Sequence, residues 1–265
     1  MHPAAQNNDT PPIRKKSSWG RWLALLVFGS LAVAAYAVYQ GAIQIPERFN
    51  PWAPLQVAAE PNVLTPYKLA RARGDPAMCL AALGQTGMQY DVLPDRETGA
   101  GCGFDNAVRL RSAAMRFGAP LPLSCPLALS LAMWERHALQ PATQFHFGQR
   151  VVAIDNLGSY SCRNVNRGEG AAPKAPATGA GSRSRHATAN ALDVSAFTLA
   201  SGKRISISGQ WKSRETATGR SAEALWLDDV HQGACKYFKG VLGPDYNAVH
   251  SDHFHLETGG YGMCR

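Results

Sequence analysis

A long uncharged run near the start of the chain constrains its fold more than any other feature. No residue between Arg21 and Glu47 is charged, and residues 22–43 are almost wholly apolar. About twenty apolar residues in a helix are enough to cross the hydrocarbon core of a bilayer. Trp22 at one end and Tyr39 towards the other are typical of the membrane interface. The run therefore predicts a transmembrane helix over residues 22–43.

The charges beside this run predict its orientation. Four basic residues precede it, the last of them Arg21, against the single acid Asp9. Because positively charged flanks remain on the cytoplasmic side, we expect residues 1–21 to form a basic cytoplasmic tail. A cleaved signal peptide is the alternative, since Ala35-Tyr36-Ala37 loosely fits a cleavage site with small residues. Either interpretation puts the rest of the chain outside the cytoplasm.

The cysteines agree with export. All six follow the apolar run, and an even number of cysteines in an oxidising compartment predicts disulfides. The sequence leaves many pairings open, and we favour sequential pairing. No two cysteines have the close spacing of a structural zinc cluster, so such a cluster is not expected. The six are Cys79, Cys102, Cys125, Cys162, Cys235 and Cys264.

The chain as a whole has the composition of a globular protein. It has 45% apolar and 17% charged residues, so most of it should bury a core. Prolines punctuate residues 44–60, and proline is unfit for a helix interior or a central strand. We therefore expect a tether over residues 44–60 and one folded domain over residues 61–265. The net charge of +8 includes no Lys and Arg run interleaved with aromatic residues, so nucleic acid is not expected as a partner.

Hydrophobic periodicity predicts short strands mixed with helices. Pro126 suits the first turn of a helix, which we expect Pro141 to end or break. A second helix is expected over residues 221–239, with an apolar face that continues to Val241. A loop rich in Gly, Ala, Pro and Ser is expected over residues 167–184. The elements follow no regular strand–helix–strand order, so the expected fold class is α+β. The strands are expected over residues 151–154, 191–199, 204–208 and 253–257.

Two segments carry the residues best suited to chemistry. The first contains His186 and Asp193, and the second contains His250, His253 and His255. Imidazoles and carboxylates are ligands that zinc accepts. Because side chains alternate across a sheet, Asp193, His253 and His255 share one face if their strands are neighbours. His186, on the loop that enters the first strand, would complete the cluster. Three protein ligands would leave a fourth position for water, which is typical of catalytic zinc.

Chance is the alternative explanation of these histidines. The chain has eight of them, so a lone His-x-His pattern carries little information. Two segments that both fall on predicted strands are less expected by accident. His137 and His146 have no such partner motif, and we interpret them as surface or packing residues.

The same segments resemble those of known families. Residues His186 to Asp193 resemble the His-x-x-Gly-x-Ala-x-Asp signature of zinc peptidases of the bacterial cell wall. Those are the D-Ala-D-Ala carboxypeptidases, the lysostaphin-type enzymes and the penicillin-insensitive murein endopeptidases. The ending His250-x-x-His253-x-His255 is similar to the murein endopeptidase version. From about residue 45 to its end, the chain also resembles the extensin-like C-terminal domain family of bacterial envelope proteins. That resemblance rests on Pro51-Trp52-Ala53-Pro54-Leu55, Cys102-Gly103, Gly158-Ser159-Tyr160-Ser161-Cys162-Arg163-Asn164 and Leu242-Gly243-Pro244-Asp245-Tyr246-Asn247.

The resemblance implies a fold and a function. The fold would be a zinc-peptidase architecture of the D-Ala-D-Ala carboxypeptidase and lysostaphin-like type, a small antiparallel sheet with helices packed on one face. His186, Asp193 and His255 would bind one zinc ion. The chain would be a zinc metallopeptidase that hydrolyses amide bonds in peptidoglycan stem peptides or cross-links, with an endopeptidase favoured. It would be a single-pass protein of the inner membrane with a periplasmic domain. The alternatives are a non-catalytic zinc-containing module that binds the cell wall or scaffolds the envelope, and a disulfide-stapled scaffold without metal.

The resemblance also implies roles around the metal. His253 would be a general base or transition-state partner, with His250 near it. Asp252 stands where the carboxypeptidases have a glutamate, and we rank it below His253 as the base. Arg163 resembles an arginine that related enzymes hold over the substrate carbonyl or carboxylate, with an ordinary salt bridge as the alternative. The glycine of the signature is Ala189 in this chain, which puts full activity in question.

Overall fold

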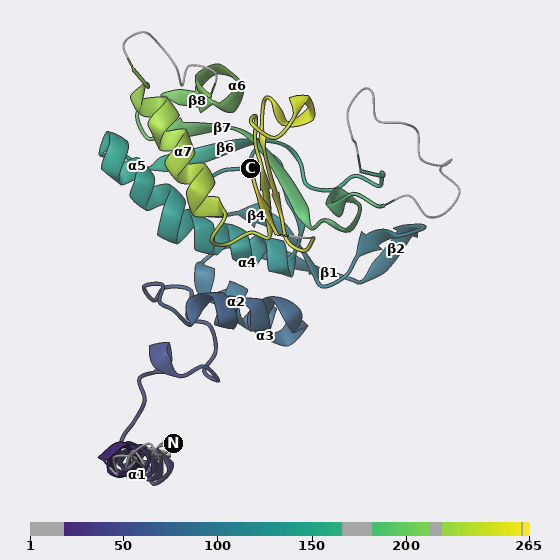
Figure 1. The fold of residues 1–265 in the computed structure, drawn as a ribbon. Helices are drawn as coiled ribbons and strands as arrows, with labels where there is room; N and C mark the ends of the chain where they lie inside the picture. Colours follow the sequence, from purple (N-terminus) through teal and green to yellow (C-terminus); the bar gives the residue numbers. More distant parts are fainter. Residues whose placement is uncertain (1–18, 166–181, 212–218, 261) are drawn as a thin grey trace, which may run out of the picture. The chain divides into compact units, whose positions relative to one another are not determined.

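The computed structural model describes residues 19–165, 182–211, 219–260 and 262–265. The chain divides into two units, Met1–Pro46 and Glu47–Arg265, and Figure 1 traces both along the sequence. Most of the expected tail over residues 1–21 and most of the expected loop over residues 167–184 lie outside the described residues.

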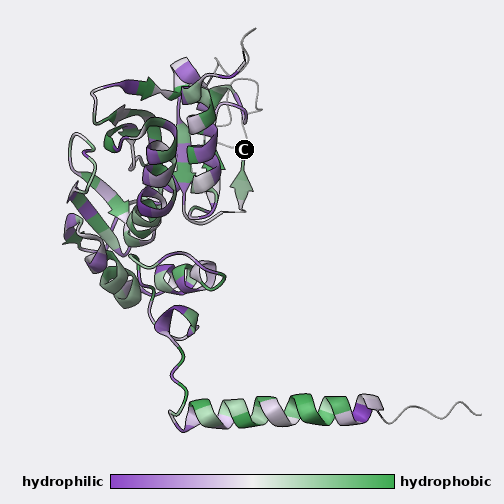
Figure 2. Ribbon diagram, turned by 90° about the vertical axis from the view of Figure 1, so that its left-hand side faces the viewer, coloured by the Kyte–Doolittle hydropathy of each residue, from purple (hydrophilic) through white to green (hydrophobic). Residues whose placement is uncertain are grey.

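The first unit contains one helix. α1 spans Trp19–Tyr39, and none of its residues is buried within the chain. Apolar residues run along its length, as the colouring of Figure 2 shows. By length and composition it can cross a membrane. The predicted apolar helix is confirmed; it includes Arg21, since arginine is a good helix former, and it ends at Tyr39, before the expected end at residue 43.

The second unit begins at Glu47, earlier than the expected boundary at residue 61. Leu55 and Val57 join its buried core. Prolines keep this stretch from forming a long helix or strand but leave the apolar side chains between them free to pack. The segment that we expected to be a tether therefore contributes to the core. The helical elements at this end are η1 (Glu47–Phe49), α2 (Thr65–Gly74), α3 (Pro76–Leu83) and η2 (Gly84–Thr86).

Two small antiparallel sheets follow that periodicity did not predict. One has the order β1-β4-β5, and the other is the hairpin of β2 and β3. β1 and β2 contain no buried residue, so the alternation of apolar and polar residues that marks a strand is weak there. The strands are β1 (Gln89–Leu93), β2 (Arg96–Gly99), β3 (Cys102–Phe104), β4 (Ala107–Ser112) and β5 (Leu121–Ser124).

The helix that begins beside Pro126 continues through Pro141, contrary to the prediction. A π-helical turn, Glu135–Leu139, joins α4 (Cys125–Trp134) to α5 (Gln140–Phe147). The π turn shifts the spacing of the backbone hydrogen bonds, and Pro141 stands in the first turn of α5, where its missing N–H is tolerated. The later helix α7 (Ala222–Ala234) ends before residue 239, and Val241 lies on β9 instead.

The largest sheet contains the predicted strands with changed ends: the strand expected over residues 204–208 ends at Ser206, where a short helix begins, and the strand expected over residues 253–257 begins at Phe254. Its order is β11-β9-β10-β7-β6, with β8 paired to β7. Every pair is antiparallel except β11 with β9. Helices combined with antiparallel sheets confirm the α+β class. The elements are β6 (Val151–Gly158), β7 (Ala191–Leu199), β8 (Arg204–Ser206), α6 (Ile207–Gln210), β9 (Gly240–Leu242), β10 (Phe254–Glu257) and β11 (Met263–Cys264).

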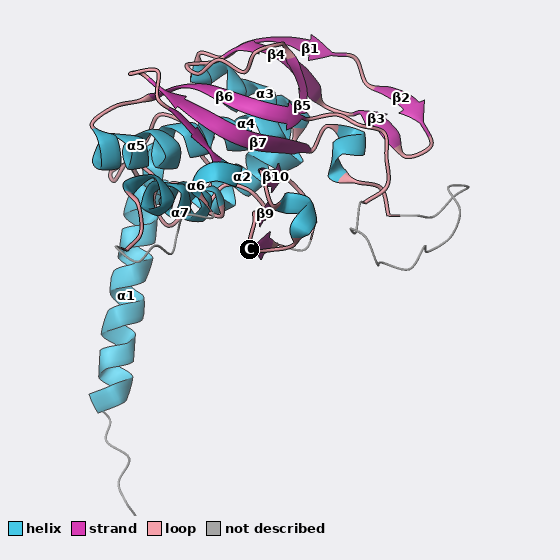
Figure 3. Cartoon of the chain, turned by 90° about the horizontal axis from the view of Figure 1, so that it is seen from above, coloured by secondary structure: helices cyan, strands magenta, loops and turns pink. Residues whose placement is uncertain are grey.

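Helices α4 and α7 pack against this sheet through aromatic rings (Figure 3). Phe197 of β7 lies 6.2 Å from Trp134 and 5.1 Å from Trp226, measured between ring centroids. The register of β6 with β7 skips Ser195, which is the mark of a β-bulge. Because the bulge shifts the alternation, Phe197 points to the core while Asp193 faces the opposite side of the sheet.

Three disulfides connect the second unit. They join Cys79 to Cys125, Cys102 to Cys162 and Cys235 to Cys264. Sequential pairing, which we favoured, is correct only for the last pair. The other two are decided by packing: α3 lies against α4, and the β2–β3 hairpin lies beside the chain that leaves β6. Contacts of this kind between distant segments are not encoded in the order of the cysteines.

Candidate metal centre

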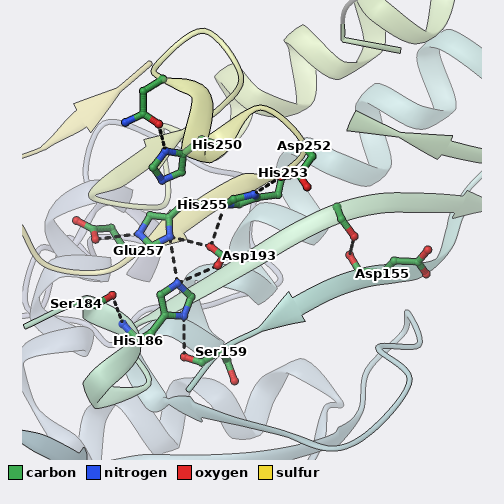
Figure 4. Close-up of polar contacts among 12 residues, drawn as sticks. Asp155, Ser159, Ser184, His186, Asp193, His250, Asp252, His253, His255 and Glu257 are labelled. Carbon is green, nitrogen blue, oxygen red and sulfur yellow. Dashed lines mark hydrogen bonds and ion pairs between the residues drawn. The ribbon is translucent and has the colours of Figure 1, made fainter. Parts of the chain in front are cut away.

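The three predicted ligands meet on one face of the sheet (Figure 4). β10 pairs with β7 so that His255 stands opposite Asp193, and His186 comes from the turn just before β7. His186 Nε2 lies 3.1 Å from Asp193 Oδ2 and 3.3 Å from His255 Nδ1. Asp193 Oδ1 lies 2.8 Å from His255 Nδ1. All three residues are buried, and their ligand atoms form a compact group.

The separations within this group fit a single tetrahedral ion. With zinc–ligand bonds of about 2.0–2.1 Å, two ligand atoms of a tetrahedral site stand about 3.3 Å apart. The contacts among the three side chains span 2.8 to 3.3 Å. Two imidazoles and one carboxylate form a donor set that suits zinc and other borderline divalent metals. The residues therefore fit the implied metal.

A short turn positions His186. η4 (Arg185–Thr188) begins after Ser184, whose hydroxyl accepts the backbone N–H of His186 at 3.3 Å. The turn ends at Ala189, which has a φ of 53°. The left-handed conformation that the glycine of the signature would allow is thus present with alanine, at a cost of roughly 1–2 kcal/mol. The backbone N–H of Ser124 donates to the Ala189 carbonyl at 2.8 Å and holds the turn in place.

Each histidine of this candidate site has an acceptor behind its ring. His186 Nδ1 lies 3.2 Å from the carbonyl oxygen of Ser159, and since a carbonyl only accepts, Nδ1 carries the hydrogen. His255 Nε2 lies 3.2 Å from Glu257 Oε2. The nitrogens that remain, His186 Nε2 and His255 Nδ1, point into the group around Asp193. Metal-binding histidines commonly donate in this way to a carbonyl or carboxylate, which fixes the ring orientation.

Sequence reasoning missed both acceptors. Glu257 could have been found, because it follows His255 by two residues on the same strand and therefore shares its face. Ser159 contributes a backbone carbonyl, which any residue type could supply, so its identity carried no signal.

Charges within the group shift the pKa values of its members. Burial alone would lower the pKa of His255, but its hydrogen bonds to Asp193 and Glu257 outweigh burial and raise the pKa to about 9. Burial alone would raise the pKa of Asp193, but its close contacts with the imidazoles of His186 and His255 hold it below its usual range. Without a metal, His255 and Asp193 therefore form an imidazolium–carboxylate pair at neutral pH.

His253 and His250 lie beside the three ligands. His253 Nε2 lies 3.6 Å from Asp193 Oδ1, and its Nδ1 lies 2.8 Å from the carboxylate of Asp252. The ring of His250 lies 5.2 Å from that of His253 and 5.7 Å from that of His255. Burial and the neighbouring imidazoles lower the pKa of His250 to about 4, so it is neutral at neutral pH. Asp252 is mostly exposed and orients His253 instead of facing the ligands.

Arg163 lies on the chain segment beside the turn of His186. Its carbonyl accepts the backbone N–H of Ser184 at 3.1 Å, and its side chain is exposed. Its positive charge is one of the influences that lower the pKa of His250. The Arg163 guanidinium therefore influences the site through its charge.

A second group with suitable atoms among the described residues is His231, Cys235 and Cys264. The two cysteines form a disulfide, so neither offers the thiolate that metals bind. His231 Nε2 lies 3.2 Å from the Arg265 carbonyl. This group fixes the end of the chain against α7.

His137 and His146 lie in ordinary packing contacts, as expected. His137 Nε2 lies 2.8 Å from the Val57 carbonyl, and His146 Nε2 lies 2.7 Å from an Asp229 carboxylate oxygen. Both histidines therefore use their Nε2 atoms to hold neighbouring segments of the fold.

Comparison with known proteins identifies one family. The family described as Extensin-like protein C-terminus matches residues 77–265, more than half of the chain. No curated protein and no solved structure gives a significant match. The matched range contains every residue of the candidate site.

Proposed function

The chain belongs to the extensin-like protein C-terminus family, and we propose that its folded unit is a zinc-dependent peptidoglycan hydrolase related to the cell-wall zinc peptidases. The observation that carries this proposal is the convergence of His186, Asp193 and His255, with an acceptor behind each imidazole. A site with three protein ligands keeps a fourth position for water or substrate, which is typical of catalytic zinc.

Zinc held by these residues would polarise the scissile carbonyl and lower the pKa of a water molecule towards about 7. The contacts of His253 suit it to the proton transfers. Because Asp252 holds its Nδ1, its Nε2 faces the ligand group and can take a proton from the attacking water. The same nitrogen can return that proton to the leaving amine, as amide hydrolysis requires.

Two further residues suit the substrate, and one of them favours an anion. Arg163 adds a positive charge that suits a carboxylate of the substrate or the negative charge that develops on the attacked carbonyl oxygen. His250 stays neutral beside His253, so it can donate or accept a hydrogen bond without adding charge. Stem peptides of peptidoglycan carry carboxylates, which agrees with the positive charge of Arg163.

The proposed location is the bacterial inner membrane. α1 would anchor the chain with residues 1–21 in the cytoplasm and the folded unit in the periplasm, by the positive-inside rule. The three disulfides support an oxidising compartment. We favour a cross-link endopeptidase because the ending with His250, His253 and His255 resembles the murein endopeptidases.

The test uses the full chain in detergent, loaded with zinc and incubated with defined cross-linked muropeptides. The wild type should cleave one type of linkage, which product masses identify. His255→Ala should lose zinc and cleavage, whereas His253→Gln should keep zinc and lose cleavage. His146→Gln is the matched control and should keep both, since this histidine pairs with Asp229 away from the site.

Two results would contradict hydrolysis. Wild-type chain that binds zinc but cleaves none of the muropeptides would favour the non-catalytic binding module. Cleavage that survives in His255→Ala would show that the activity does not come from this site.

A further inference from the structure

Two neighbouring segments expose large apolar side chains close to where the folded unit begins. We call these side chains together the apolar face. Its first half is Phe49 and Trp52, 47% and 76% exposed, and its second half is Val63 and Tyr67, 89% and 50% exposed. Single exposed apolar residues are ordinary on proteins, but a group of them from neighbouring segments indicates an interaction site.

Hydrogen bonds to backbone carbonyls hold the two halves side by side. Asn62 Nδ2 donates to the Arg48 carbonyl at 2.9 Å, and an Arg71 guanidinium nitrogen donates to the Pro51 carbonyl at 2.9 Å. Each bond runs from the segment of the second half to the segment of the first. The apolar face is therefore preorganised, so little conformational entropy is lost when it meets a partner.

Cationic groups flank the rings of the apolar face. The Arg48 guanidinium lies 4.6 Å from the ring centroid of Phe49, and that of Arg71 lies 6.0 Å from the ring centroid of Tyr67. Tryptophan and tyrosine are enriched where hydrocarbon meets lipid headgroups. Arginine beside them can reach the lipid phosphates while its stem stays against apolar groups. This composition suits the headgroup layer of a bilayer.

The chain itself brings a bilayer within reach. α1 ends at Tyr39, and the stretch from there to Phe49 spans at most about 35 Å when fully extended. A membrane crossed by α1 therefore stays at high effective concentration beside the apolar face. No diffusing partner has this advantage, and for that reason we assign the face to lipid.

We propose that the apolar face lies in the headgroup layer of the bilayer that α1 crosses, and that it orients the folded unit on the membrane. This inference rests on the membrane anchor of the proposed function, but neither on zinc nor on hydrolysis.

The test measures membrane depth in the full chain, reconstituted in nanodiscs of phosphatidylethanolamine and phosphatidylglycerol. A nitroxide is attached to Val63→Cys or, as the matched control, to Phe145→Cys on α5, which is 85% exposed. Mass spectrometry first verifies that the three native disulfides remain. Collision of the nitroxide with oxygen, which concentrates in lipid, is then compared with collision with a nickel chelate, which stays in water. We expect a higher oxygen-to-nickel ratio at position 63 than at position 145.

Three outcomes would overturn the proposal. Equal, water-like ratios at both positions would show that the apolar face is in solvent. Low collision rates with both reagents at position 63 would show that a second copy or another protein covers it. A chain that does not stay with the nanodisc would refute the anchor. None of these results changes the zinc content or muropeptide cleavage, so the two proposals fail separately.

Discussion

Replacing Glu257 by alanine should weaken zinc binding, and the deficit should grow as the pH rises. Glu257 accepts from His255 Nε2 at 3.2 Å, and its side chain is largely buried at 19% exposed. Loss of such an acceptor behind a metal-binding histidine commonly weakens metal affinity by roughly 10- to 100-fold. That range corresponds to about 1.4–2.7 kcal/mol, the size of one hydrogen bond to a charged group. Glu257→Gln keeps an acceptor oxygen, so its loss of zinc affinity should be near the smaller, roughly 10-fold end of this range.

The pH dependence follows from the proton on His255. Its pKa is raised to about 9 in the metal-free chain, so below that pH a proton competes with zinc. The apparent affinity of the wild type should therefore rise about tenfold per pH unit up to about pH 9. Glu257→Ala removes one of the carboxylates that raise the pKa, so its affinity should level off at a lower pH. The zinc affinities of the wild type and Glu257→Ala should therefore differ least near neutral pH and by the full factor of roughly 10- to 100-fold near pH 9.

The assay is competition with a chelating zinc indicator, performed on the full chain between pH 6.5 and 9. Glu223→Ala is the control. Glu223 lies on α7 and forms an ion pair with Lys203, which precedes β8, so the zinc affinity of this variant should follow that of the wild type throughout. An affinity of Glu257→Ala that equals that of the wild type near pH 9 would refute the role assigned to this carboxylate.

Three further changes test the fold around the site. Ala189→Val should destabilise the chain by about 2–3 kcal/mol in denaturant unfolding, because a β-branched residue at positive φ is strained. A valine variant that is more stable than Ala189→Gly, in which glycine adopts this conformation freely, would contradict this. Glu135→Gln should raise the melting temperature at pH 7, since burial raises the pKa of Glu135 above its usual range. Because the pKa of Glu135 is raised in the folded chain, ionising this carboxyl costs stability only as the pH rises above its pKa in the unfolded chain. The gain in melting temperature of Glu135→Gln should therefore vanish below about pH 4. A gain that persists in acid would point to another cause. Replacing Cys79 and Cys125 together by alanine should cost about 2–5 kcal/mol, whereas an unchanged midpoint would show that this bond adds no stability.

The sequence was most informative where chemistry depends on local alternation. His255 points to the face opposite the core because strand side chains alternate, and an antiparallel neighbour brings Asp193 to the same face. His253 precedes β10, and its ring nevertheless lies 3.6 Å from Asp193. The same rule extended by two residues would have found Glu257. These inferences need only one strand and its partner, and the hydrophobic pattern marks both.

The features that escaped prediction depend on contacts between distant segments. Cys79 pairs with Cys125 because α3 packs on α4, which no local pattern encodes. The bulge at Ser195 lets Phe197 enter the core, and only the register of β6 with β7 reveals it. Pro141 predicts the end of a helix, but the π turn before it allows the helix to continue through Pro141.

The central claim is that His186, Asp193 and His255 hold one zinc ion, and a direct count of metal tests it best. The purified full chain is exposed to zinc, freed of loosely bound metal and analysed by elemental mass spectrometry. We predict about one zinc per wild-type chain, the same for His146→Gln, and none for Asp193→Ala. A wild-type chain without zinc, or an Asp193→Ala chain that retains it, would contradict the account.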